Sequence, residues 1–158
     1  MAVKRNSIMS AVVTRMQGIL ISAGYYSNLG SNVFEWRPKV VTEGGASYVP
    51  TEQTELPALH IRDTADETER ADLSGNEDHT LAVEIEIAHE ATATGVTMRK
   101  HIEDVRKAIG VDQSWSGLAL HTDSAMTMET VRLQADRTFF RTLIRLRIAY
   151  TTSAFNES

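Results

Sequence analysis

The sequence predicts an α+β fold in which two helices pack on one face of a two-layer, mainly antiparallel β-sheet. Segments 7–23 and 97–109 place apolar residues three and four positions apart, as amphipathic helices do. Several other segments alternate apolar and polar residues, which is typical of strands with one buried face. The order α-β-β-β-α-β-β-β, without an internal repeat, favours one sheet with both helices on the same side.

The first predicted helix spans residues 7–23. Its apolar stripe includes Ile8, Val12 and Met16, and this face is expected to pack on the sheet. Gly24 follows the last residue of the pattern, and glycine readily adopts the left-handed conformation that ends a helix.

Three strands are predicted next, over residues 32–37, 56–62 and 80–90. The first two are separated by residues 38–55, which hold two prolines and two glycines and are expected to form a long loop. The last two are separated by residues 63–78, which carry seven of the 21 acidic residues and one arginine. We expect this segment to be an acidic surface loop.

The second predicted helix begins at Thr97, a good N-cap residue, and ends before Gly110. Trp115 follows shortly afterwards. We expect its side chain to close the core near the end of the helix, and a contact with a partner protein is the alternative, because tryptophan is enriched at interface anchors.

The remaining predicted strands cover residues 118–122, 127–134 and 138–151, with a tight turn at Asp136-Arg137. At about 3.3 Å per residue the last strand would be roughly 40 Å long, far longer than a usual strand. Two interpretations stay open. The hairpin overshoots the domain and reaches another molecule, or a bulge divides it.

Strand alternation also predicts a polar face of the sheet, opposite the helices. Opposite charges on adjacent strands stabilise by about 0.2–1 kcal/mol per pair, so this face is suited to water or to another polar surface. Its arginines could contact phosphates, but the neighbouring glutamates would cancel much of their field. The residues assigned to it are His60, Arg62, Glu84, Glu86, Arg141, Arg145 and Arg147.

Composition excludes several classes of protein. The 158 residues fit one domain, spanning residues 1–158, and the net charge of −5 disfavours a general nucleic-acid binder. The absence of cysteine excludes disulfide scaffolds, thiolate metal sites and thiol catalysis. No stretch approaches 18 consecutive apolar residues, so we expect no membrane span. We also expect no signal peptide, because no apolar core follows the charged start.

No catalytic or metal motif is present. The five histidines lack ligand spacing and are expected at the surface or at strand edges. The chain has neither a phosphate-binding glycine loop nor a nucleophile elbow. Acidic residues 63–69 miss the spacing of a calcium loop, and Glu84 and Glu86 are two residues apart on one strand. We therefore expect no enzyme activity, cofactor or metal, and a catalytic site without a motif is the alternative.

The order of segments nevertheless resembles a known family. An opening helix ends at a turn, an aromatic strand follows, and an acidic segment separates two strands before a second helix and a long last strand. In this order the chain is similar to the tail terminator (tail completion) proteins of long-tailed bacteriophages. The segments that carry the resemblance are 9–16, 23–25, 33–38, 56–61, 81–87, 102–110, 115–119 and 144–151.

The resemblance implies a structural protein of the virion that forms a ring, typically a hexamer, without catalytic residues or a cofactor. The ring caps the tail tube at its head-proximal end, stops its polymerisation and offers the surface that docks to the head. Its partners would be further copies, the tail tube protein and a head–tail connector, with DNA only passing through the lumen, and assembly would take place in the host cytoplasm. Another neck component, such as a head-completion or adaptor protein, is the nearest alternative, and a small cytosolic ligand-binding or enzymatic domain is the next.

A ring uses heterologous contacts, in which one patch meets a different patch on the neighbour. We expect the acidic segment to meet a basic surface on a neighbouring subunit or tail protein, and the polar sheet face to meet the ring interior or another subunit. The candidate interface residues are Glu67, Glu69, Asp72, Glu84, Glu86, Arg141, Arg145 and Arg147.

Overall fold

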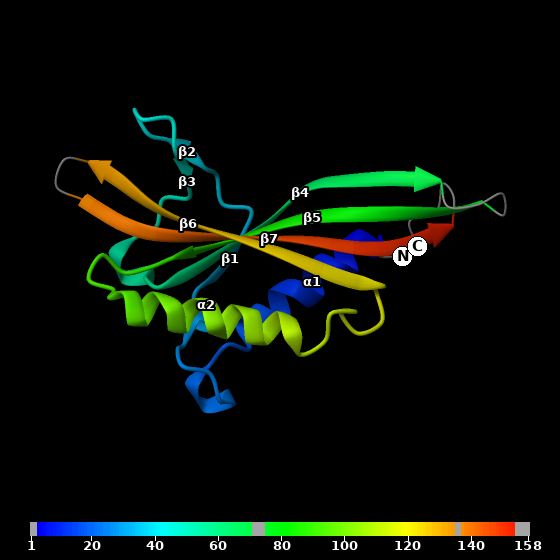
Figure 1. Cartoon of the computed structure of the whole chain (residues 1–158), viewed down its shortest axis with the longest axis horizontal. Helices are drawn as coiled ribbons and strands as arrows, with labels where there is room; N and C mark the ends of the chain where they lie inside the picture. Colours follow the sequence, from blue (N-terminus) through cyan, green and yellow to red (C-terminus); the bar gives the residue numbers. More distant parts are fainter. Residues whose placement is uncertain (1–2, 71–74, 135–136, 154–158) are drawn as a thin grey trace.

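The computed structural model describes residues 3–70, 75–134 and 137–153, and it has the predicted α+β fold (Figure 1). Five strands form the main sheet in the order β1-β4-β5-β7-β6. β1 runs parallel to β4, and the other neighbours are antiparallel. The strands are β1 (Val33–Glu35), β4 (Ala58–Arg70), β5 (Asn76–Ala88), β6 (His121–Gln134) and β7 (Arg137–Ser153).

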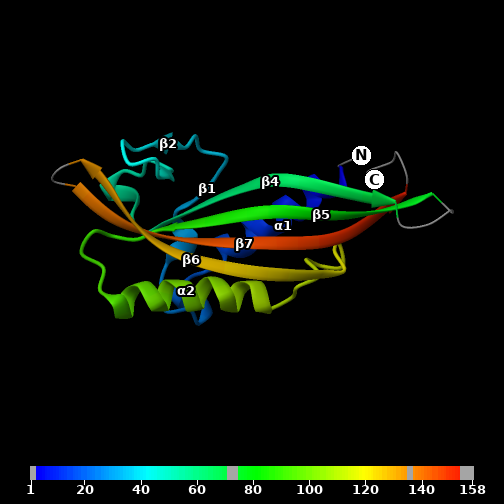
Figure 2. The ribbon, with the colours of Figure 1, turned by 45° about the horizontal axis from the view of Figure 1, so that its top comes forward.

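Two helices, α1 (Lys4–Gln17) and α2 (Gly95–Gly110), lie on the same side of this sheet (Figures 1 and 2). The core between the two layers is apolar and includes Ile8 and Val12 from α1, Val105 from α2, and Ile85 on β5, each with no more than 1% of its surface exposed. Burying an aliphatic side chain of this size stabilises the fold by about 1.5–3 kcal/mol. The predicted layering is therefore confirmed.

The ends of both helices differ from the prediction. α1 ends at Gln17 rather than at residue 23, because Gly30 packs directly against the helix end and its N–H donates to the carbonyl of Ile19 at 2.9 Å. A Cβ at Gly30 would collide with the carbonyl oxygen of Gln17. Gly24 does adopt the left-handed conformation, with φ of 86°, but it ends the short 3-10 helix η1 (Ile21–Ala23).

α2 begins one turn earlier than predicted. Its N-cap is Thr94, whose hydroxyl accepts a hydrogen bond from the N–H of Thr97 at 3.3 Å. The backbone N–H of Thr97 is thus a hydrogen-bond donor in the first turn, and Thr97 is not the N-cap residue. Trp115 is fully buried beyond the end of α2, so the prediction that it closes the core is confirmed.

The predicted acidic loop at 63–78 is wrong. Residues 63–70 continue β4 and residues 76–78 begin β5, and the two strands pair as far as Arg70 and Glu77. Arg5 of α1 still contacts Asp63 and lies 4.0 Å from Asp66, so a charged pair replaces apolar packing there. Further along, the ends of β4 and β5 extend beyond both helices (Figures 1 and 2), so neither face needs apolar side chains. Asp72 lies outside the described residues.

The last hairpin is long, as one of the two interpretations expected. β7 pairs with β5 from Arg141 to Ser153 without a register shift, so no bulge divides it there. β6 begins at His121, so it contains the whole strand predicted at 127–134 but only two residues of the strand predicted at 118–122. The only irregularity in the described pairing of β6 and β7 lies between Arg132 and Gln134. Asp136 of the predicted turn lies outside the described residues.

Residues 38–55 are more structured than a loop. They contain a small hairpin, β2 (Val40–Val41) and β3 (Ser47–Tyr48), and the 3-10 helix η3 (Gln53–Glu55). A further 3-10 helix, η2 (Leu29–Ser31), precedes β1. In the described part of the chain, no helix is long and apolar enough to cross a bilayer.

Candidate interaction surface

The polar face of the sheet is divided into a covered half and an exposed half. Residues 37–55, which we call the strap, lie over the first half. Beneath the strap, Glu86 and Arg141 form an ion pair of 3.0 Å with 1% and 4% of their surfaces exposed. The N–H of Val49 in the strap donates to the second carboxylate oxygen of Glu86 at 3.1 Å. A backbone group of the strap therefore helps to satisfy this buried carboxylate.

Polar contacts attach the strap at several points. Lys39 forms an ion pair with Glu84, and the hydroxyl of Thr51 lies 2.7 Å from Nε2 of His60. Within the strap, Arg37 and Glu55 form a bidentate pair at 2.8 and 2.9 Å. The prediction that this face meets solvent or a partner is therefore wrong for Glu84, Glu86 and Arg141. The side chains of the protein's own strap cover them.

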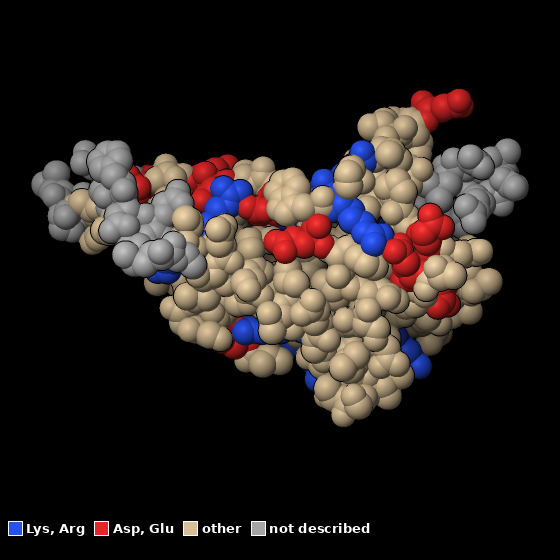
Figure 3. Space-filling model, turned by 180° about the vertical axis from the view of Figure 1, so that it is seen from behind, with Lys and Arg blue, Asp and Glu red and all other residues tan. Residues whose placement is uncertain are grey.

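The second half of the polar face is open. The side chains of Arg145 and Arg147 are 58% and 63% exposed, and Glu67 is 72% exposed. Arg145 lies 3.8 Å from Glu84 and Arg147 lies 3.4 Å from Glu67, so the predicted ion-pair face is present here. Acidic and basic side chains are interspersed across the molecule seen from behind in Figure 3. Both arginines are largely exposed, so these pairs contribute about 0–1 kcal/mol each.

Among the described side chains at the far end of β4, acidic residues predominate. Glu69 stands directly opposite Asp78 on β5, and like charges in this position repel. Glu67 lies two residues before Glu69, on the same exposed strand end. This end of the sheet is therefore suited to contact a positively charged surface. Of the predicted interface residues, Glu67, Glu69, Arg145 and Arg147 are accessible.

Both edges of the main sheet are open over long stretches in the described residues. β1 covers β4 only as far as Ile61, which leaves the rest of β4 as an edge. β6 forms the opposite edge over 14 residues, and its Met126 and Met128 are 46% and 53% exposed. Unpaired strand edges of this length readily pair with another chain.

Four of the five histidines are buried, contrary to the prediction of surface or edge positions. His89 and His101 lie with their Nδ1 atoms 2.9 Å apart, between the sheet and α2, and Nε2 of His89 lies 2.8 Å from the hydroxyl of Thr142. Burial lowers the pKa of His89 to about 4, and it also lowers the pKa of His101. Burial, followed by the charge of Arg37, lowers the pKa of His60 to about 4.

These histidines predict a loss of stability in acid. Between the ordinary pKa of 6.5 and the folded value of about 4, the unfolded chain binds protons that the folded chain does not. The contribution of these neutral histidines to the free energy of unfolding is complete above pH 6.5 and is lost as the pH falls toward 4. From His60 and His89 together we expect urea unfolding at pH 5 to give a free energy about 2–4 kcal/mol below that at pH 7.

The double variant His60→Gln and His89→Gln tests this expectation. It should flatten the pH dependence, whereas His121→Gln, at an exposed position, should leave the slope unchanged. Equal slopes in all three proteins would contradict the assignment. Among the described residues, no group of three or more His, Asp or Glu side chains is placed to hold a metal ion.

No protein-family model matches the chain, and a search of curated proteins finds no significant match. Inference about function therefore depends on the sequence pattern and the geometry of the surface.

Sequence reasoning missed the strap contacts. Lys39, Val49 and Thr51 lie in a segment without regular alternation, and no local signal connects them to strands far along the chain. The even spacing of Glu84 and Glu86 did place both on the polar face. Spacing alone contains no information about which segment covers that face.

Proposed function

We propose that this protein is a structural component of a long-tailed phage virion, which assembles into a ring that caps the tail tube at its head-proximal end. The proposal rests on the order of segments described above and on one structural observation. The main sheet has two open edges on opposite sides, β6 and the part of β4 beyond Ile61. The proposed function does not involve a catalytic group.

Open edges on opposite sides suit head-to-tail assembly. The β6 edge of one copy can pair with the outer half of β4 in the next copy, so that each subunit uses two different surfaces. Such contacts form a closed ring when a whole number of equal rotations from one copy to the next adds up to a full turn. Backbone hydrogen bonds supply affinity in this mode, and side chains on the edges supply specificity.

Charge at the strand ends adds a second contact. Glu67 and Glu69 lie on the exposed end of β4, which we propose meets a basic surface of a neighbouring subunit or tail protein. Opposite charges across such a contact speed association and fix the relative position of the two partners. The ring would then provide the docking surface for the head, and a connector protein would be its partner there.

The variant Glu67→Lys and Glu69→Lys tests the contact. We expect it to lower the fraction of protein in rings about tenfold, because two like-charged surfaces would then meet. Size-exclusion chromatography with light scattering and negative-stain microscopy measure this fraction, and complementation of a terminator-deficient phage measures tail joining. Glu43→Lys, at an exposed position in the strap, is the matched control.

The outcomes separate the proposals. A closed ring with an open lumen supports the terminator function, and its loss in the double variant supports the acidic contact. A protein that stays monomeric at all concentrations contradicts ring formation and favours a ligand-binding domain. Rings that form equally well in the double variant contradict only the acidic contact.

A further inference from the structure

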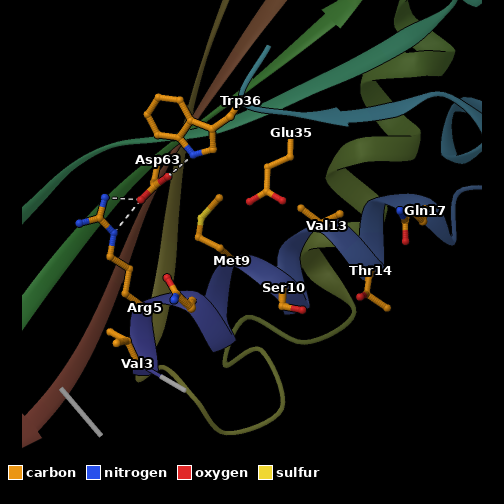
Figure 4. Close-up of a pocket in the computed structure, with 11 residues that line it drawn as sticks. Val3, Arg5, Met9, Ser10, Val13, Thr14, Gln17, Glu35, Trp36 and Asp63 are labelled. Atoms are coloured by element: carbon orange, nitrogen blue, oxygen red, sulfur yellow. Dashed lines mark hydrogen bonds and ion pairs between the residues drawn. The ribbon is translucent and has the colours of Figure 1, made fainter. Parts of the chain in front are cut away.

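A groove lies between α1 and the end of β1, on the helix side of the sheet (Figure 4). Its volume is about 790 Å³, large enough for a side chain and its flanking backbone. Met9 and Val13 of α1 provide apolar surface, and Ser10 and Thr14 provide hydroxyl groups. Trp36 stands at the opposite side of the groove.

Trp36 is held in an unusual position. It has φ of 57°, in the left-handed region that bulky residues rarely adopt, and yet its side chain is 55% exposed. Its indole N–H donates to the buried carboxylate of Asp63 at 2.8 Å, and the other oxygen of Asp63 accepts from Nε of Arg5 at 2.6 Å. Left-handed conformations of this kind concentrate at ligand-binding sites, where the surroundings fix them.

Glu35 gives the groove its charge. Its carboxylate points into the groove toward Met9 and Val13 (Figure 4), and it makes no hydrogen bond or ion pair with any described residue. Among the described residues that line the groove, Arg5 is the only cation, and it is already paired with Asp63 and lies 4.0 Å from Asp66. The groove therefore carries an uncompensated negative charge beside apolar and aromatic surface.

We propose that this groove binds an arginine or lysine side chain presented by an extended segment of a partner protein. The cationic group would pair with Glu35, and its aliphatic stem would pack on Met9, Val13 and Trp36. The backbone of the segment would lie along the open edge of β1, which pairs with β4 on one side only. The site borders the start of the open β4 edge, because Asp63 lines the groove, but peptide binding there does not require ring assembly.

The test uses the full chain and a defined probe, the peptide acetyl-Ala-Val-Arg-Leu-Ala-amide, followed by two-dimensional NMR. Its neutral control has citrulline, which keeps the shape of arginine but lacks its charge. We expect saturable shifts of the indole resonance of Trp36, while that of the buried Trp115 stays unchanged. The citrulline peptide should bind about fivefold more weakly, as expected for one partly exposed ion pair.

Glu35→Gln should weaken binding of the arginine peptide by a similar factor and remove the difference between the two peptides. Glu43→Gln, which changes an exposed glutamate outside the groove, should bind like the unaltered protein. Equal affinity for the arginine and citrulline peptides in the unaltered protein would overturn the proposal. The absence of saturable shifts at a peptide concentration ten times a dissociation constant of about 1 mM would also overturn it.

Discussion

Replacement of Arg141 by methionine is expected to lower the free energy of unfolding by about 3–5 kcal/mol, because it leaves the charge of Glu86 buried without its partner. The two side chains lie 3.0 Å apart and are almost fully buried beneath the strap. Urea unfolding at pH 7 measures the loss. Arg145→Met is the matched control, because its guanidinium is 58% exposed, and its loss should stay below about 1 kcal/mol.

The pH dependence of the unfolding free energy provides an independent check that the buried charge of Glu86 causes the loss of stability. Burial raises the pKa of Glu86 above its ordinary value, although the hydrogen bond and charge of Arg141 oppose the rise, so removal of Arg141 makes the charged carboxylate still less favourable in the folded protein. Stability from such a group is present at low pH and is lost as the pH rises through the folded pKa. The deficit of the Arg141 variant relative to the unaltered protein should therefore shrink as the pH falls from 7 to 5.

Two results would contradict this account. One is an equal loss in the Arg141 and Arg145 variants, which would mean that burial does not decide the effect. The other is a deficit that stays constant or grows in acid. In the double variant Arg141→Met with Glu86→Gln, part of the lost stability should return, because no unpaired charge remains under the strap.

Trp115→Ala is expected to cost about 3–5 kcal/mol of unfolding free energy, the usual range for emptying the site of a large buried aromatic. The side chain is fully buried, and its indole N–H donates to the hydroxyl of Thr122 at 2.8 Å. The guanidinium of Arg15 lies 4.3 Å from the ring centroid. The variant therefore loses packing, a hydrogen bond and a cation–π contact.

The second tryptophan supplies the comparison. Trp36 is 55% exposed, so Trp36→Ala should cost about 1 kcal/mol or less, mainly through its hydrogen bond to Asp63. Thermal or urea unfolding followed by circular dichroism measures both variants without relying on tryptophan fluorescence. Similar losses in the two proteins would show that Trp115 does not close the core as the structure indicates.

Much of the fold could be predicted because it depends on local pattern. Leu81, Val83, Ile85 and Ile87 alternate with polar residues, and this alternation placed β5 on the core correctly. The spacing of Ile102 and Val105 did the same for α2. The apolar alternation ends where the strands extend beyond the helices, so the sequence of the acidic end of β4 resembles that of a loop. Strand pairing there is decided by the neighbouring strand and not by local apolar residues.

The candidate site could be predicted only in part. Arg145, Arg147 and Glu67 are exposed as expected, whereas Glu86 and Arg141 are covered by the strap. The groove at Trp36 was not foreseen, because its walls come from α1, β1 and β4.

The sequence by itself determined the presence of two helices, the core strands and, for β5 and β7, which side chains occupy each face of the sheet. Periodicity encodes these features because successive side chains of a helix or strand point in fixed relative directions. Only the tertiary structure decided what lies against the second face, which histidines are buried and where the sheet edges stay open. Those features arise from contacts between residues far apart in the chain, and no local repeat specifies them.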